Sequence, residues 1–394
     1  MKIQIPKNPK LIIDLLLAEG YEAGLVGGCL RNILLGIAAN DFDIATSATT
    51  VQMKKLFKHF TVISIGEKYG TLIIVVDGEN IEVTTFRKES NYSDNRRPDK
   101  VEFLSNLDED LKRRDYTINA LYYNDKVGLI DHYQSISDIN KKIIRAVGDP
   151  LERFEEDSLR ILRGIRFAAK LKFQIEDKTN LAIKEAYTLL SNIKAERIAI
   201  ELIGILNCPD IKNIINEYLP VFQFLIKDLG EIDSVKFDNM PTLRLKLAVF
   251  FSALDTKIEI YKKLMDLKLT VSSLIRKSDL RDIATIINIS KKDTSNILQI
   301  YRELKWNRAL LEEVYTFSTK SHLFNEIPSI GIQDMAIKGT DVLSLGFSDE
   351  MIQQILDECF YNLLLGKISN TKSAYCDLIT EKYSNKVIIT LDTK

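Results

Sequence analysis

Residues 26–45 read Val-Gly-Gly-Cys-Leu-Arg-Asn-Ile-Leu-Leu-Gly-Ile-Ala-Ala-Asn-Asp-Phe-Asp-Ile-Ala, and this stretch decides how the rest of the chain is interpreted. An apolar run at residues 23–26 precedes a glycine pair, and apolar residues at helical spacing follow it. This order predicts a strand, a tight glycine turn and a helix. Glycine lets a ligand approach the backbone, and the N–H groups at a helix start bind phosphate. We therefore expect Gly28 and Arg31 to hold an anion, since a guanidinium can donate paired hydrogen bonds.

Two aspartates close this stretch, Asp41 and Asp43. If they lie on a strand, their side chains share one face about 6.6 Å apart, and Phe42 points into the core. Two carboxylates beside a phosphate-binding turn predict a Mg²⁺ site for phosphoryl or nucleotidyl transfer. Each feature alone is common in solvated loops and turns, so the prediction depends on their order and short separation.

Composition sets the broad class of protein. The chain has 394 residues, enough for two or more domains, and 54 Lys and Arg against 55 Asp and Glu. A nucleic-acid partner is therefore not indicated by net charge, and any basic surface must be local. The four cysteines show neither metal-type spacing nor a disulfide framework, which favours a reducing, cytoplasmic location. The apolar run at residues 11–17 contains Asp14, so it predicts an amphipathic helix, not a signal peptide or a membrane span.

Strand patterns follow the aspartate pair. Residues 61–65, 71–76 and 81–86 read as strands, and Asp-Gly-Glu-Asn at residues 77–80 predicts a hairpin turn. Glu82 on the returning strand either presents a third carboxylate toward the aspartate pair or is an ordinary exposed residue.

A polar stretch at residues 88–100 interrupts the strands. Its Asn, Ser, Asp and Arg content predicts a mobile loop, after which residues 101–104 resume the sheet. The basic residues 112–114 are followed at once by apolar ones, so we expect them at the rim of a packed element.

A long helix is predicted to begin at Asp149. Asp149 as N-cap, Pro150 at the first position and Glu152 form a strong start signal. Apolar residues at helical spacing between residues 151 and 169 predict a packed face. On the other side of the helix, polar residues recur every three positions. They form either a solvated surface or, because the cations among them are all arginine, a surface that recognises planar groups. The row consists of Asp157, Arg160, Arg163 and Arg166.

Strand patterns end near residue 148, and helical patterns continue almost to the end of the chain. The expected fold class is α+β, with a mixed β-sheet in an N-terminal head and an all-α remainder. The predicted domains are residues 1–148, 149–206, 207–325 and 326–394. The sequence marks the boundary between residues 325 and 326 least clearly.

Taken together, these motifs resemble those of the class II tRNA nucleotidyltransferases, the CCA-adding enzymes, which belong to the polymerase β superfamily and share motifs with bacterial poly(A) polymerases. The family turn Gly-Gly-x-x-Arg-Asp matches residues 27–32, and the Asp-x-Asp pair matches residues 41–43. Arg-Arg-Asp-Phe-Thr-Ile-Asn-Ala matches residues 113–120, which have Tyr at the fourth position. Glu-Asp-x-x-Arg with further arginines matches residues 156–166, and a Glu-Arg helix matches Glu196, Arg197 and Glu201.

The resemblance implies a polymerase β-like head followed by a helical neck, body and tail, the tail binding tRNA. It implies addition of C, C and A to the tRNA 3′ end from CTP and ATP, with release of pyrophosphate. No obligate protein partner is expected. Mg²⁺ would be held by Asp41 and Asp43. The implied nucleotide-binding residues are Gly28, Arg31, Arg114, Asp115, Asp157, Arg160, Arg163 and Arg166.

The resemblance also suggests how C and A are accepted together. Both bases present an amino donor beside a ring-nitrogen acceptor, whereas U and G present a carbonyl beside an N–H. Asp157 can only accept and Arg160 can only donate, so the pair matches C and A. Three-residue spacing on a helix would place the two side chains side by side.

Three departures from the family pattern are visible. Asn32 replaces the usual Asp after Arg31, which loosens a supporting contact of the site but leaves both metal ligands, and the tail lacks the usual glycine-proline turn after Gly346. No His-Asp dipeptide occurs, so we expect no phosphohydrolase domain of the kind that some relatives carry.

The sequence also separates CCA addition from several alternative activities. The retained stretch at residues 88–100 favours full CCA addition over CC addition, with an A-adding enzyme as the nearest alternative. A poly(A) polymerase is disfavoured because the tail has no basic extension. An RNA-binding protein without catalysis is disfavoured by the two metal carboxylates, and a transferase acting on a protein or small molecule by the intact row from Asp157.

Overall fold

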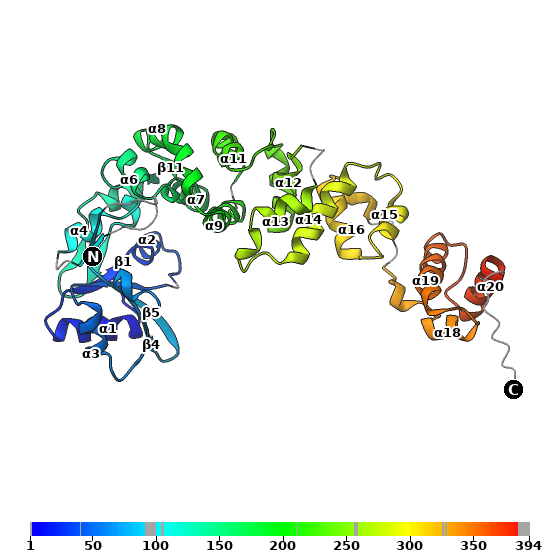
Figure 1. Cartoon of the computed structure of the whole chain (residues 1–394), viewed down its shortest axis with the longest axis horizontal. Coiled ribbons are helices and arrows are strands. Elements are labelled where there is room, and N and C mark those ends of the chain that lie inside the picture. Colours follow the sequence, from blue (N-terminus) through cyan, green and yellow to red (C-terminus); the bar gives the residue numbers. More distant parts are fainter. Residues whose placement is uncertain are drawn as a thin grey trace. The chain divides into compact units, whose positions relative to one another are not determined.

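The protein divides into two compact units, Met1–Gly230 with Asp266–Ser273, and Glu231–Met265 with Leu274–Lys394. Figure 1 shows the mixed α/β elements in blue and cyan, and mainly helices from green to red. This computed structural model describes residues 2–39, 41–90, 100–103, 106–209, 211–255, 259–324, 327 and 329–384.

The first unit is built on a seven-stranded sheet with strand order β3-β4-β5-β2-β1-β8-β9. β2 and β5 are parallel, and all other neighbours are antiparallel, so the sheet is mixed and the expected α+β class is confirmed. The strands are β1 (Ala23–Val26), β2 (Asp43–Thr46), β3 (Thr61–Ile63), β4 (Thr71–Val76), β5 (Glu79–Thr85), β8 (Tyr122–Asn124) and β9 (Gly128–Ile130).

The β4–β5 hairpin confirms the predicted turn but shortens it. Asp77 and Gly78 both have positive φ, 49° and 80°, as two-residue hairpin turns that match strand twist require. The strand therefore resumes at Glu79, and Asn80 pairs with Val75 inside the ladder.

Short helices surround this sheet and longer ones follow it. In α1, Pro9, Ile12, Ile13 and Leu16 are buried, the spacing of a helix with one packed face. The helices of the first unit are α1 (Lys7–Ala18), α2 (Gly28–Leu34), α3 (Thr50–Leu56), α4 (Leu107–Lys112), α5 (Ser135–Lys141), α6 (Pro150–Glu156), α7 (Leu159–Leu171), α8 (Asp177–Ala186), α9 (Ala195–Leu206), α10 (Lys212–Glu217) and α11 (Leu219–Leu225).

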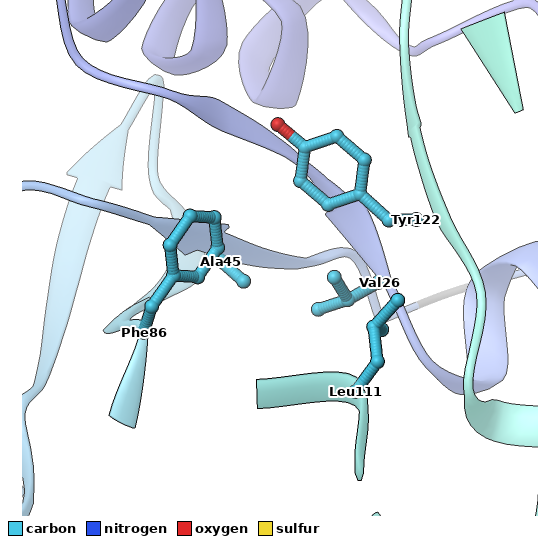
Figure 2. Packing of buried hydrophobic residues seen from close by; sticks show 5 residues of the cluster. All are labelled: Val26, Ala45, Phe86, Leu111 and Tyr122. Carbon is cyan, nitrogen blue, oxygen red and sulfur yellow. The ribbon is translucent and has the colours of Figure 1, made fainter. Parts of the chain in front are cut away.

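A cluster of buried side chains lies behind the glycine turn. Figure 2 shows it: Val26 of β1, Ala45 of β2, Leu111 of α4 and Tyr122 of β8 pack with Phe86, which follows β5. The rings of Phe86 and Tyr122 meet edge to face, 6.3 Å between centroids. Because Val26 immediately precedes the glycine pair, this core fixes where the turn begins.

The helix predicted from Asp149 starts as expected but is broken. The Asp149 side chain accepts hydrogen bonds from the N–H groups of Leu151 and Glu152, and α6 then ends at Glu156. Asp157 has an extended backbone, with φ −140° and ψ 97°, and α7 begins at Leu159. The cause is local, because the Asp157 carboxylate accepts from the Leu159 N–H at 3.2 Å, a bond that competes with helix continuation.

Two expectations about strands were wrong. Residues 101–103 do not resume the central sheet, and residue 104 lies outside the described residues; β6 (Arg87–Ser90) pairs with β7 (Lys100–Phe103) in a separate antiparallel ribbon. β5 already has a neighbour on each side, β2 and β4, so the strand that follows it cannot add beside it. Residues 91–99, most of the expected loop, lie outside the described residues. One short strand does occur after residue 148, since β11 (Gln174–Ile175) pairs in parallel with β10 (Ile143–Ile144).

The second unit is helical throughout its described part. α12, α14 and α16 pack together and bury apolar side chains such as Phe250, Ile283 and Val314. No helix in the described residues is long and apolar enough to cross a membrane. The predicted boundaries near residues 148, 206 and 325 stay predictions. The helices are α12 (Leu243–Ser252), α13 (Ile260–Asp266), α14 (Lys277–Ser290), α15 (Ile297–Glu303), α16 (Arg308–Phe317), α17 (Ser321–Phe324), α18 (Gly339–Ser344), α19 (Asp349–Leu364) and α20 (Lys372–Tyr383).

Candidate active site

Strand register brings the glycine turn and the second aspartate together. The antiparallel pairing of β1 with β2 sets Val26 opposite Asp43, so Gly27 and Gly28 follow directly beside the start of β2. Gly27 has φ +77°, a conformation that favours glycine, and α2 begins at Gly28. A Cβ on Gly27 would lie 3.3 Å from Nη1 of Arg114. The predicted strand, turn and helix are thus confirmed.

A pocket of about 490 Å³ opens over this turn. Its lining is dominated by charge, with six arginines and three aspartates. Arginine clusters of this kind suit a polyanion such as a nucleoside triphosphate. The first pocket is lined by Arg87, Arg113, Arg114, Arg160, Arg163, Arg197, Asp43, Asp115, Asp157, Gly27, Gly28, Tyr69 and Asn119.

The aspartate pair differs from the expected strand geometry. β2 begins at Asp43, so Asp41 precedes the strand, and Phe42 is only half-buried instead of lying in the core. The ladder stops here because the partner strand ends at Val26 and turns away at the glycine pair. Removal from water raises the pKa of Asp43, Arg114 opposes this rise, and Asp41 adds to it. The two carboxylates are therefore close enough to repel one another.

Glu82 lies on β5, next to the strand that carries Asp43. Partial removal from water and then the charge of Asp43 raise the pKa of Glu82, so its carboxylate is in the field of the pair. Within the described ranges, however, no three Asp, Glu, His or Cys side chains are arranged to hold a metal ion together. Both alternatives for Glu82 stay open.

A second pocket of about 480 Å³ adjoins the first. Gly28 and Asp43 line both pockets, whereas Asp41 lines only the second. Asp43 thus lies at the boundary between the two pockets. The other residues of the second pocket are Cys29, Arg31, Asn32, Ile37, Ala38, Lys170 and Leu171.

Arg31 lines the second pocket and not the first, and its side chain has protein partners. It is only 5% exposed, and its guanidinium donates to Oδ1 of Asn119 at 2.6 Å. Two more bonds, of 3.2 and 2.9 Å, go to Oδ1 of Asn32. An amide oxygen thus occupies the place of the family's carboxylate, and a neutral acceptor binds a guanidinium less strongly than a charged one.

Asp115 is the centre of the most strongly bonded group in the first pocket. Its Oδ2 accepts two hydrogen bonds from Arg163, at 2.8 and 2.6 Å, and its Oδ1 accepts one from Asn119 at 3.2 Å. Burial opposes ionisation, but the charge and hydrogen bonds of Arg163 lower the pKa of Asp115 to about 2. The carboxylate is therefore ionised and rigidly held at neutral pH.

Arg113 and Arg114 share one buried anchor, Asp110. Arg113 Nη2 donates to its Oδ1 at 2.6 Å, and Arg114 Nη2 donates to its Oδ2 at 3.0 Å. The Nε atom of Arg114 is buried and has no hydrogen-bond partner in the described part of the chain. The Arg114 guanidinium thus retains donor capacity beside the glycine turn.

The predicted template pair, Asp157 and Arg160, lines the first pocket, but each residue has a charged neighbour. Arg160 donates to Oε2 of Glu156 at 2.9 Å and to the Arg113 carbonyl at 2.9 Å. Asp157 is paired with Arg197 at 3.3 Å. These contacts hold both side chains at the pocket wall.

Arg166 lines neither pocket, and its Nε lies 2.7 Å from Oε2 of Glu201. Sequence reasoning did not assign Tyr69, Arg87, Arg113, Asn119 or Arg197 to the site, although the last three lie within recognised motifs. Their motif positions were the available signal.

Comparison with known families agrees with this geometry. A family model described as the poly A polymerase head domain matches residues 23–145. A second, described as a probable RNA and SrmB-binding site of polymerase A, matches residues 172–218.

Full-length relatives decide the family. The CCA-adding enzyme of Streptococcus mutans is 33% identical, over 94% of this chain and 96% of the relative. That of Enterococcus faecalis is 49% identical, over 48% of this chain and 46% of the relative. This chain belongs to the CCA-adding enzyme family. It is accordingly a tRNA nucleotidyltransferase, and enzymes of this family are generally metal-dependent.

Solved CCA-adding enzymes have the same fold. The Bacillus stearothermophilus CCA-adding enzyme in complex with CTP is 25% identical and superposes with a TM-score of 0.76, covering 96% of this chain and 99% of that one. The Thermotoga maritima CCA-adding enzyme complexed with tRNA is 19% identical, with a TM-score of 0.70 and 94% coverage of each chain. The similarity extends over the described parts of both units.

Proposed function

We propose that this protein adds C, C and A to the 3′ end of tRNA, using CTP and ATP and releasing pyrophosphate. The observation that carries the proposal is the first pocket, in which six arginines surround the glycine turn and Asp43 in a chain of the CCA-adding family. The named relatives, which match nearly the whole chain, favour CCA addition over A addition or poly(A) synthesis.

The carboxylates at the pocket boundary fit a divalent cation. Asp41 and Asp43 are hard oxygen donors. Removal from water is the main cause of the raised pKa of Asp43, and repulsion from Asp41 adds to it; a cation would relieve that repulsion. They would hold Mg²⁺, with Glu82 as a third carboxylate nearby. When bound, the ion would lower the pKa of the attacking hydroxyl and shield the charge that develops on the phosphate.

The triphosphate would lie over the glycine turn. Gly27 and Gly28 leave the backbone open to it, and α2 begins there. Arg114 would bind phosphate oxygens directly, since it lines the first pocket and its Nη1 lies beside the glycine turn. Asp115 is ionised and can accept from a ribose 2′-hydroxyl, which would distinguish ribonucleotides from deoxyribonucleotides.

Arg31 and Arg166 would contribute in a different way from the remaining predicted nucleotide-binding residues. Arg31 orients Asn119, which in turn holds Asp115, and Arg166 is engaged with Glu201. We propose that both act as positioning residues that hold the nucleotide-binding side chains in place.

Base choice would rest on Asp157 and Arg160. The carboxylate accepts from the amino group of C or A, and the guanidinium donates to the adjacent ring nitrogen. Arg197 and Glu156 pair with these two residues and so limit their rotation. A base of opposite polarity would leave charged groups unpaired, at a cost of about 1–3 kcal/mol for each contact.

The second pocket would receive the RNA 3′ end. Asp41 faces only this pocket and Asp43 faces both, so an acceptor hydroxyl here would be next to the carboxylates and opposite the triphosphate. Its attack on the α-phosphate would form the new phosphodiester bond, and pyrophosphate would leave on the side of the arginines. We place this reaction in the cytoplasm, where tRNA ends are processed.

One assay tests this function. A tRNA transcript lacking its last three nucleotides is incubated with CTP, with ATP or with both, and the product ends are sequenced. We expect CC from CTP alone and CCA from the mixture. Addition of A only to transcripts that already end in CC would instead indicate an A-adding enzyme, and long A tracts on unrelated RNA a poly(A) polymerase.

A further inference from the structure

Asp110 contacts two arginines of the first pocket but does not line that pocket. It lies on α4 and is completely buried. We propose that Asp110 is a positioning residue, which holds the Arg114 guanidinium so that one of its nitrogens points at the glycine turn, where the triphosphate binds. This inference rests on the proposed function and deepens it.

The two terminal nitrogens of Arg114 have different surroundings. Nη2 donates to Oδ2 of Asp110 at 3.0 Å. Nη1 would lie 3.3 Å from a Cβ placed on Gly27, and it donates to no residue in the described part of the chain. A guanidinium is planar and rigid, so fixing one nitrogen determines where the other points. The bond to Asp110 therefore sets the direction of the nitrogen that faces the turn.

Asp110 is itself held by the core behind the turn. The next residue on α4, Leu111, is completely buried and packs in the same cluster as Val26, which immediately precedes the glycine pair. Burial opposes ionisation of Asp110, but the charges of its two arginine partners lower its pKa, so the carboxylate is charged at neutral pH. The same core thus fixes both the turn and the charged group that orients Arg114.

The two oxygens of this carboxylate have different partners. Oδ1 accepts from Nε and Nη2 of Arg113, at 3.0 and 2.6 Å, and from the Arg87 N–H at 3.4 Å. Oδ2 accepts from Arg114. In Asp110→Asn the amide keeps one oxygen, and its NH₂ group can only donate. The oxygen should stay with the three donors on the Oδ1 side, so the NH₂ group would face Nη2 of Arg114. The substitution therefore releases Arg114 while preserving the shape of the side chain.

The experiment uses inorganic tripolyphosphate, which carries the phosphate chain without a base or a sugar. Its affinity is measured by calorimetry in metal-free buffer for the wild type, Asp110→Asn, Arg114→Met and the double variant. We expect each single variant to bind about fivefold to tenfold more weakly than the wild type. The double variant should lie within about twofold of Arg114→Met, because Asp110 acts through Arg114.

Asp279→Asn on α14 is the matched control. Asp279 is 9% exposed, lies 3.6 Å from Arg244 and 3.3 Å from Arg276, and accepts from the Arg276 N–H at 2.7 Å. It thus resembles Asp110 in pairing with two arginines and one backbone donor. Asp279→Asn should bind tripolyphosphate as the wild type does. An equal loss in both variants would show that removing any such carboxylate loosens the protein, and it would overturn the inference.

Nucleotide addition gives a readout that a general structural role would not produce. CTP and ATP share the triphosphate, so Asp110→Asn should raise KM for both by the same factor, about fivefold to tenfold, and change kcat less. A rise for one nucleotide alone would place the defect in base recognition and contradict the inference.

Tripolyphosphate binding also separates this inference from the proposed function. If the wild type adds no nucleotide to tRNA, the proposed function fails, but the binding comparison still tests Asp110. Asp110→Asn removes a negative charge, which by itself favours anion binding, so an affinity equal to or above that of the wild type overturns the inference. Losses that multiply in the double variant, or a wild type that binds no tripolyphosphate, also overturn it.

Arg114→Lys tests the same geometry if Asp110→Asn does not fold. Its single charged nitrogen cannot both bind Asp110 and lie at the glycine turn, so it should bind tripolyphosphate about as weakly as Arg114→Met. A folded Arg114→Lys protein with wild-type affinity overturns the inference.

Discussion

The guanidinium of Arg163 donates two hydrogen bonds to Oδ2 of Asp115, at 2.8 and 2.6 Å, across 48 residues of sequence. Asp115 lies between α4 and α5 and Arg163 lies on α7, so this ion pair joins the predicted sugar-reading and base-reading motifs. Because Asp115 also accepts from Asn119, which Arg31 orients, the pair connects the glycine-turn helix to the same group.

Replacing Arg163 should reveal the charge that it neutralises. Arg163→Met leaves Asp115 buried without a cation, so the pKa of Asp115 should rise above 3.8 instead of lying near 2. In the wild type, this carboxylate stabilises the fold fully above pH 3.8, and the contribution is lost as pH falls toward 2. In the variant, the ionised carboxylate of Asp115 is buried without a cation and destabilises the fold at neutral pH. Protonation of Asp115 removes this destabilisation. Urea unfolding at pH 7 should show a loss of about 2 kcal/mol, below the value for a fully buried pair because solvent reaches part of Arg163. The deficit should shrink at pH 4; a deficit that grows on acidification would contradict the assignment.

Asp43→Ala should abolish nucleotide addition, with a rate loss of about 10³-fold or more, because no neighbouring group replaces a carboxylate shared by both pockets. The metal-free fold should be retained and slightly stabilised, since the substitution removes repulsion with Asp41 and Glu82. Primer extension and thermal unfolding without metal measure the two effects. Asp14→Ala on α1, an exposed aspartate, is the control. A folded Asp43→Ala protein that still turns over would exclude this metal assignment.

Phe167 is predicted to stabilise three arginines at once. The guanidinium carbons of Arg31, Arg163 and Arg166 lie 5.3, 5.6 and 5.4 Å from its ring centroid. Phe167→Leu keeps an apolar side chain but removes the ring face, so the three cations lose a common partner. We expect a loss of about 1–3 kcal/mol in unfolding free energy, greater at low salt than at high salt. Phe173→Leu is the matched control, because the exposed fraction is 7% for both Phe167 and Phe173. Equal losses with equal salt dependence in both variants would indicate packing alone.

Where a structural feature depends on residues that are adjacent in the sequence, the sequence was sufficient to predict it. The strand, glycine turn and helix around Gly27 follow from adjacent residues, and the pairing of Val26 with Asp43 then brings the Asp43 carboxylate beside the turn. The break at Asp157 was missed because apolar periodicity continues through it, and only the side-chain bond to Leu159 shows the cap. Contacts between distant residues were also out of reach. Arg197 meets Asp157 across 40 residues, and nothing in the sequence indicates that Arg31 is buried, since arginine is mostly exposed.

The most direct test of base choice exchanges the template charges, and the structure shows why two substitutions are insufficient. Asp157→Arg with Arg160→Asp should favour U and G, whose edges have the opposite polarity. However, the new arginine at position 157 would face Arg197, and the new aspartate at position 160 would face Glu156, so each would be repelled from its place. We therefore expect the double variant to lose most activity.

A quadruple variant that adds Arg197→Glu and Glu156→Arg restores opposite charges at both positions. It should regain part of the rate and incorporate U and G in preference to C and A, at an overall cost of about tenfold or more because the new pairs differ in length. The companion variant with only Arg197→Glu and Glu156→Arg is the control, and it should keep the preference for C and A while losing rate. Single-nucleotide incorporation with each of the four NTPs measures all three proteins. If the quadruple variant folds, turns over and still takes only C and A, base choice does not reside in Asp157 and Arg160, because both of their contacts with those bases would then be of like polarity.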